Sequence, residues 1–192
     1  MQSKSVQKTP YLSRRAFLTA AAAAPLAACS NGLASEGGQR IDIRVDNAMQ
    51  LMYREVPGSQ DLEQDAAGML IMPLVTEAGF GFGGSYGRGA LRINNTTVDY
   101  YSAISGTFGL QIGAQQYSHA LFFMTPQALS DFRNTGAWAV GADVRYAVNT
   151  DAANLGIDST AVLDPVIAVV FGQAGLIAGA TLDGTRYNRI LP

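Results

Sequence analysis

Between residues 79 and 115, large apolar residues repeatedly alternate with glycine, and this alternation is the strongest constraint on the fold. Phenylalanine alternates with glycine over residues 79–83, and large apolar residues alternate with glycine and glutamine over residues 108–115. A period of two predicts β-strands. Glycine along one face lets a sheet curl tightly, and closing a curled sheet removes its exposed edges. We therefore predict a largely antiparallel, Gly-rich, curled, barrel-like β-sheet. Further strands are expected at 69–75, 97–105, 118–124, 139–148, 165–173 and 176–182.

Helical spacing comes before the sheet. Apolar residues recur every three or four positions from residue 41 to residue 52, and Pro57-Gly58 ends the pattern. The polar residues of this helix carry both signs, so packing against a core is favoured over lying flat on a membrane. A second short helix is expected at 60–67, and Thr125-Pro126 predicts a helix near 126–133. The predicted fold class is therefore α+β.

The first 28 residues have the features of a signal peptide. Basic residues, including Arg14 and Arg15, precede an apolar stretch at 16–28. This stretch of about 13 residues is shorter than the about 20 residues that a membrane-spanning helix needs. Ser13-Arg14-Arg15-Ala16-Phe17-Leu18 is similar to a twin-arginine export signal, in which a receptor reads the paired arginines. The alternative is a general secretory signal that happens to contain basic residues.

Cys29 directly follows this apolar stretch. Leu26-Ala27-Ala28-Cys29 resembles a lipobox, where a peptidase cuts before a cysteine that then carries a diacylglyceryl group. The alternative is a chance thiol. Two or three acyl chains anchor a protein firmly, whereas one chain binds reversibly. Because Ser30 rather than aspartate follows, we expect a lipid-anchored protein of the bacterial envelope, at the outer membrane and facing the periplasm. Residues 29–40 are small and polar and predict a flexible tether, which leaves 41–192 as the folded domain.

The composition excludes several kinds of chemistry. Lysine occurs only at positions 4 and 8, so the chain from Cys29 has nine arginines against 15 acidic residues, a net charge of −6. Chemistry that depends on lysine is therefore excluded from the domain, and nucleic acid is not expected as a partner. A single cysteine and a single histidine argue against a metal site built from protein ligands alone.

Three local motifs suggest chemistry, but each has a simpler interpretation. Residues 79–84 match the dinucleotide fingerprint G-x-G-x-x-G, yet the glycines that follow would not start the helix that this site needs. Asp61-x-Glu63-x-Asp65 begins like a calcium loop but lacks the later glycine and glutamate. His119 lies in an apolar run, which favours a structural or rim histidine over a catalytic base.

Two kinds of side chain are candidates for contact with a lipid. Arg88 and Arg92 are four residues apart on a predicted strand, hence on one face, and their guanidinium groups could hold a phosphate head group. Salt bridges to the surplus acidic residues are the alternative. The same alternatives apply to Arg186 and Arg189. Apolar contacts could come from Phe80, Phe82 and Tyr86 if these face outward.

Four glycine-rich or capped segments together resemble the SYLF-domain family, a lipid-binding module of eukaryotic membrane-trafficking proteins and bacterial lipoproteins. They are residues 78–89, 107–115, 123–129 and 175–185, in the order of the family. The resemblance implies phospholipid binding and no catalytic residues. Eukaryotic members often carry a lysine where this chain has Gln173-Ala174, so a lipid interaction that depends less on charge is expected.

These observations predict an envelope lipoprotein whose domain binds membrane phospholipid without catalysis or a cofactor. The alternative is a structural lipoprotein that binds another envelope protein. A hydrolase that uses His119 is a third hypothesis. The predicted lipid attachment site is Cys29, and the candidate lipid-binding residues are Arg88, Arg92, Phe80, Phe82 and Tyr86.

Overall fold

The computed structural model describes residues 33, 35–140, 144–148, 164–175, 182 and 184–192. These residues belong to one compact unit, Asn31–Pro192. The predicted signal peptide with Arg14 and Arg15, the lipid attachment site Cys29 and most of the predicted strand at 176–182 lie outside the described residues. No helix in the described part of the chain is long and apolar enough to cross a membrane.

The first helix, α2 (Glu36–Glu55), begins five residues earlier than predicted. The side chain of Ser35 accepts a hydrogen bond from the backbone N–H of Gly38 and so caps the helix. Residues 36–40, predicted as part of the tether, are therefore helical. The predicted apolar stripe is confirmed, because its five residues are all buried: Ile41, Val45, Ala48, Met49 and Met52. A short helix, α3 (Ser59–Asp65), follows.

Two long strands, β1 (Gly68–Ile93) and β2 (Thr96–Phe123), replace the shorter strands predicted for this region. They pair as an antiparallel hairpin along almost their whole length. Asn94 and Asn95 form the connection, with φ of 49° and 61°. Asparagine tolerates this left-handed region better than most residues, and two such residues in a row suit a tight hairpin turn.

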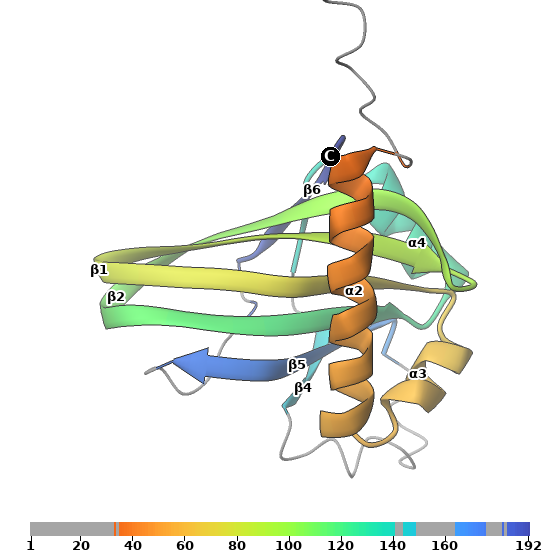
Figure 1. Ribbon diagram of the computed structural model, residues 1–192, viewed down its shortest axis with the longest axis horizontal. Coiled ribbons are helices and arrows are strands. Elements are labelled where there is room, and N and C mark those ends of the chain that lie inside the picture. Colours follow the sequence, from red (N-terminus) through yellow and green to blue (C-terminus); the bar gives the residue numbers. More distant parts are fainter. Residues whose placement is uncertain (1–32, 34, 141–143, 149–163, 176–181, 183) are drawn as a thin grey trace, which may run out of the picture. The chain divides into compact units, whose positions relative to one another are not determined.

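The hairpin is bent back on itself near its middle, so that it forms a curled half-barrel (Figure 1). At the bend, a Cβ atom on Gly79 would lie 2.7 Å from Cα of Gly83. Farther along, a Cβ atom on Gly89 would overlap the carbonyl oxygen of Ile71, which lies on the other arm of the same strand. Glycine therefore allows the two arms of β1 to approach closely, and the predicted curled, Gly-rich sheet is confirmed.

Four shorter strands complete a six-stranded sheet in the described residues. They are β3 (Trp138–Ala139), β4 (Val144–Val148), β5 (Val166–Gly175) and β6 (Arg186–Ile190). All the described strand pairs are antiparallel except β4 with β5, which is parallel. The helix predicted near 126–133 is α4 (Pro126–Asn134), capped by the side chain of Thr125.

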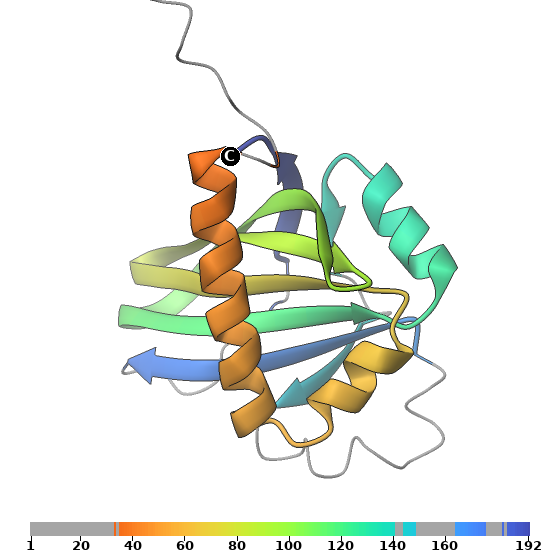
Figure 2. The same cartoon turned by 45° about the vertical axis from the view of Figure 1, so that its right-hand side comes forward.

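The sheet has an apolar core on each face. The inner face of the half-barrel holds one cluster, which includes Leu121, Phe123 and Phe132 of α4. The outer face holds a second cluster, which α2 covers by packing Val45 and Met52 against the strands. Figures 1 and 2 show α2 crossing the strands of the sheet, while the bent ends of β1 and β2 project beyond this helix. The coverage of the outer face is therefore incomplete.

Candidate functional site

The projecting end of the hairpin exposes large apolar side chains on its outer face. Phe82 is 76% exposed, Tyr86 is 53% exposed and Ile104 is 47% exposed. Tyr86 and Ile104 are direct partners across β1 and β2 and so lie side by side on one face. We call Phe82, Tyr86 and Ile104 the apolar end. Phe80 also lies in β1, but its side chain is outside what the structure describes.

The inner face of the same region is polar. Gln115 Nε2 donates a hydrogen bond of 2.7 Å to the carboxylate of Glu77, and both side chains are buried. The hydroxyl groups of Ser85 and Ser105 are 2.7 Å apart and also buried. A sheet in water normally faces its apolar residues inward and its polar residues outward. Here the order is reversed, which leaves apolar surface available for a partner.

Arginine side chains border the apolar end. Arg88 and Arg44 line a hollow of about 160 Å³ together with Tyr86 and Leu74, which is 41% exposed. Arg186 of β6 is the register partner of Ile104. Within the part of the chain that the structure describes, no carboxylate forms an ion pair with Arg44, Arg88 or Arg186. Among the described residues, the apolar end is therefore bordered by three positive charges that no carboxylate neutralises.

The structure does not bring Arg88 and Arg92 together as the sequence predicted. The two share a face of β1, but Ala90 between them is completely buried in the core beneath α2. Arg92 is 14% exposed, and its guanidinium group forms a 2.7 Å ion pair with Asp46 of that helix. The alternative of a salt bridge is therefore the correct one for Arg92. Arg88 lies beside Tyr86 and remains a candidate for contact with a lipid.

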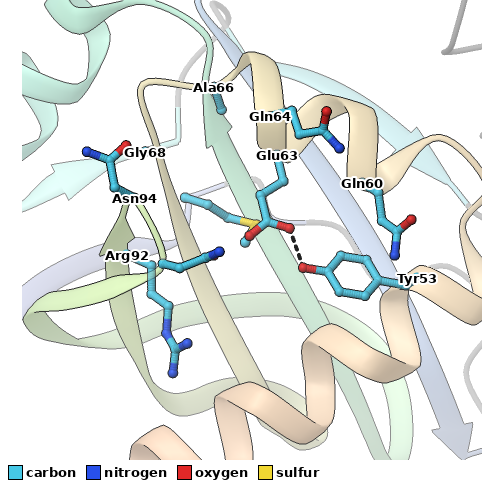
Figure 3. Close-up of a pocket in the computed structure, with 10 residues that line it drawn as sticks. Tyr53, Gln60, Glu63, Gln64, Ala66, Gly68, Arg92 and Asn94 are labelled. Atoms are coloured by element: carbon cyan, nitrogen blue, oxygen red, sulfur yellow. Dashed lines mark hydrogen bonds between the residues drawn. The ribbon is translucent and has the colours of Figure 1, made fainter.

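Arg92 instead lines a separate pocket of about 470 Å³ between α2, α3 and the turn of the hairpin. In Figure 3, Arg92 and Asn94 form one side of this pocket, and Tyr53 and Glu63 form the other. The hydroxyl group of Tyr53 donates a hydrogen bond to the carboxylate of Glu63. Burial and this carboxylate raise the pKa of Tyr53, so its hydroxyl stays protonated near neutral pH. The pocket is polar and lies apart from the apolar end.

His119 is an interior residue. Its side chain is completely buried, and burial lowers its pKa to about 3 because an apolar environment disfavours the charged form. Its Nε2 atom lies 2.7 Å from the hydroxyl group of Tyr187. This arrangement agrees with the interpretation of a structural histidine.

Asp61, Glu63 and Asp65 lie on α3 rather than in a calcium loop. In the residues that the structure describes, no group of three or more histidine, cysteine or acidic residues is placed to hold a metal ion.

Sequence reasoning missed Ile104, Leu74 and Arg44 as parts of this surface. Alternation along β2 predicts which face of the sheet Ile104 lies on, but it does not predict that α2 leaves this part of the face uncovered. Leu74 lies at an irregularity in the register between Met72 and Val75, which the alternation does not reveal. Arg44 comes from another element altogether.

The fold and the surface define an α+β domain with a curled hairpin and an uncovered apolar end. Residues 104–189 match the model of the Ysc84 family, which is described as Las17-binding protein actin regulator. The resemblance to the SYLF domain is therefore confirmed over this part of the chain. A search of curated proteins found no match to the chain.

Proposed function

We propose that this chain is a bacterial envelope lipoprotein whose non-catalytic domain binds membrane phospholipid through the apolar end. The observation that carries the proposal is the exposure of Phe82, Tyr86 and Ile104 beside arginines that form no ion pair with any residue the structure describes. Aromatic and aliphatic side chains enter the boundary between head groups and acyl chains, and arginine pairs with lipid phosphate. The reversed polarity of the hairpin fits such a contact.

Apolar contact has to supply much of the affinity. The chain from Cys29 has a net charge of −6, so an anionic bilayer repels the domain as a whole. Fully burying one large apolar side chain contributes about 1.5–3 kcal/mol. The apolar end offers three such side chains, each partly exposed already in the folded domain. The sum supports weak, reversible binding, which a lipid anchor would reinforce.

Few residues separate Cys29 from the first helix of the domain. At most about 20 Å of chain separates Cys29 from Ser35, because an extended residue spans about 3.3–3.6 Å. Ile41 and Arg44 line the same hollow as Tyr86. Ile41 lies about 9 Å along α2 from Ser35. A lipid at Cys29 would therefore keep the domain within reach of the bilayer.

The alternative function is binding of an envelope protein. An exposed apolar surface also fits a protein partner, and the matching family is described by the binding of a protein, Las17. The arginines that border the apolar end favour the lipid, because they add a match for phosphate that an apolar protein surface does not require.

Vesicle flotation of residues 30–192 tests the proposal. We expect weak binding to phosphatidylcholine vesicles and stronger binding when phosphatidylglycerol is present. Phe82→Ser with Tyr86→Ser should reduce binding to both, while Arg44→Ala with Arg88→Ala should mainly reduce the gain from phosphatidylglycerol. Leu191→Ser, at a residue that is 78% exposed, is the matched control. A folded domain that floats with neither vesicle would refute lipid binding and favour the protein partner.

A further inference from the structure

A second hollow, of about 620 Å³, lies between α4, the segment before β1 and β6. Arg133 and Arg189 line one part of it, and Leu129, Pro126 and Ala67 line another. In Figures 1 and 2, α4 lies at the opposite end of the β1–β2 hairpin from the bend. A group bound here would therefore be distinct from one that contacts the apolar end.

The two arginines share a single carboxylate. Asp99 lies 3.2 Å from Nη2 of Arg133 and 3.4 Å from Nε of Arg189. Asp99 is 16% exposed, whereas Arg133 is 40% exposed and Arg189 is 50% exposed. The cluster therefore carries one net positive charge, and the acid is its least accessible member.

The geometry of the arginines is held by the fold. Arg189 donates a 3.2 Å hydrogen bond from Nη2 to the backbone oxygen of Arg133, which ties β6 to the end of α4. Its guanidinium carbon lies 6.0 Å from the ring centre of Tyr101. Each guanidinium group has five N–H donors, and the contacts with Asp99 and with this backbone oxygen occupy only some of them. Two preorganised guanidinium groups are a suitable receptor for a carboxylate or phosphate.

We propose that this hollow binds an organic anion. The carboxylate or phosphate lies against Arg133 and Arg189, and an apolar part of the same molecule lies along Leu129 and Pro126. Leu129 is 9% exposed and packs in the inner core, so its place in the hollow is held by the core. Ser130 and Asn134 of α4 also line the hollow and add polar groups. Asp99 competes with the ligand for the two guanidinium groups while it holds them in place.

Calorimetric titration of residues 30–192 with octanoate and, separately, with inorganic phosphate tests the proposal. We expect octanoate to bind more tightly than phosphate, because only octanoate also uses the apolar side. Arg133→Ala and Arg189→Ala should each weaken octanoate binding at least fivefold, while Arg54→Ala, on the distant end of α2, should not change it.

Asp99→Asn separates a binding site from a purely structural cluster. Removing the competing carboxylate should strengthen octanoate binding several-fold while the melting temperature falls. If octanoate binding is absent in the wild-type domain, or is unchanged in Arg133→Ala and Arg189→Ala, the proposal is wrong. A phosphatidic acid vesicle serves as a further arm: binding that Arg189→Ala abolishes and Phe82→Ser does not affect would identify a lipid head group as the source of the anion.

Discussion

The hydroxyl group of Tyr187 lies 2.7 Å from Nε2 of His119 inside the half-barrel. The two residues are 68 positions apart, and both side chains are fully buried. Tyr187 belongs to β6 and His119 to β2, so this contact joins two parts of the sheet that meet only in the tertiary structure. Nδ1 of His119 is buried and has no hydrogen-bond partner among the residues that the structure describes, which leaves the ring poorly suited to carry a charge.

This burial predicts a pH-dependent stability. The pKa of His119 is about 3 in the folded state, against 6.5 for an ordinary histidine. Between these two values the unfolded chain therefore binds one more proton than the folded chain. The free energy of unfolding has its full value above pH 6.5 and falls as the pH decreases toward 3. The loss should be about 1.4 kcal/mol per pH unit in this window.

Urea unfolding between pH 7.5 and pH 5 measures this effect, because the carboxyl groups titrate mainly below that range. His119 is the only histidine of the chain, so His119→Gln should remove most of the dependence. An equally steep dependence in His119→Gln would show that another group causes it.

Gly89→Val should destabilise the domain by about 2–4 kcal/mol, because the side chain would overlap Ile71 on the neighbouring arm of β1. Gly106→Ala is the matched control in the same hairpin, since a Cβ atom there meets no atom within 4 Å. Thermal unfolding monitored by circular dichroism compares the two variants. Equal melting temperatures would contradict the close approach of the two arms.

Arg92→Ala and Arg88→Ala should have different effects. Loss of Arg92 removes the ion pair with Asp46 and should lower stability by about 1 kcal/mol, with little change in vesicle binding. Loss of Arg88 should leave the melting temperature unchanged and weaken binding to anionic vesicles. A domain in which Arg92→Ala weakens vesicle binding as strongly as Arg88→Ala would argue for a joint arginine site after all.

Cys29→Ser should release the protein from membranes and leave the domain folded, because the described unit has its own core. Fractionation of cells that express the full chain measures this release, with a high-salt wash to remove peripheral contacts. The wild-type chain should stay in the membrane fraction after the same wash. Retention of Cys29→Ser after washing would mean that lipid attachment does not explain the membrane association.

Local patterns were enough to predict much of the architecture. The spacing of Ile41, Val45 and Met52 predicts the buried stripe of α2, and Thr125-Pro126 predicts the start of α4. A helix cap and an apolar stripe depend on residues that are close in the sequence, so both can be predicted without the tertiary structure. The boundaries were less well predicted. Because Ser35 caps the helix, α2 begins within the segment predicted as a tether. The glycines allow β1 and β2 to continue through a bend, where separate strands were predicted.

The sequence by itself determined that β1 alternates, and hence that Phe82, Tyr86, Arg88 and Arg92 share a face. Only the tertiary structure decided what covers that face. The helix α2 crosses the sheet over Ala90, so its Asp46 forms an ion pair with Arg92. Tyr86 and Arg88 lie beyond the helix and stay exposed. Alternation is a local property of the backbone, whereas coverage depends on where a distant helix packs.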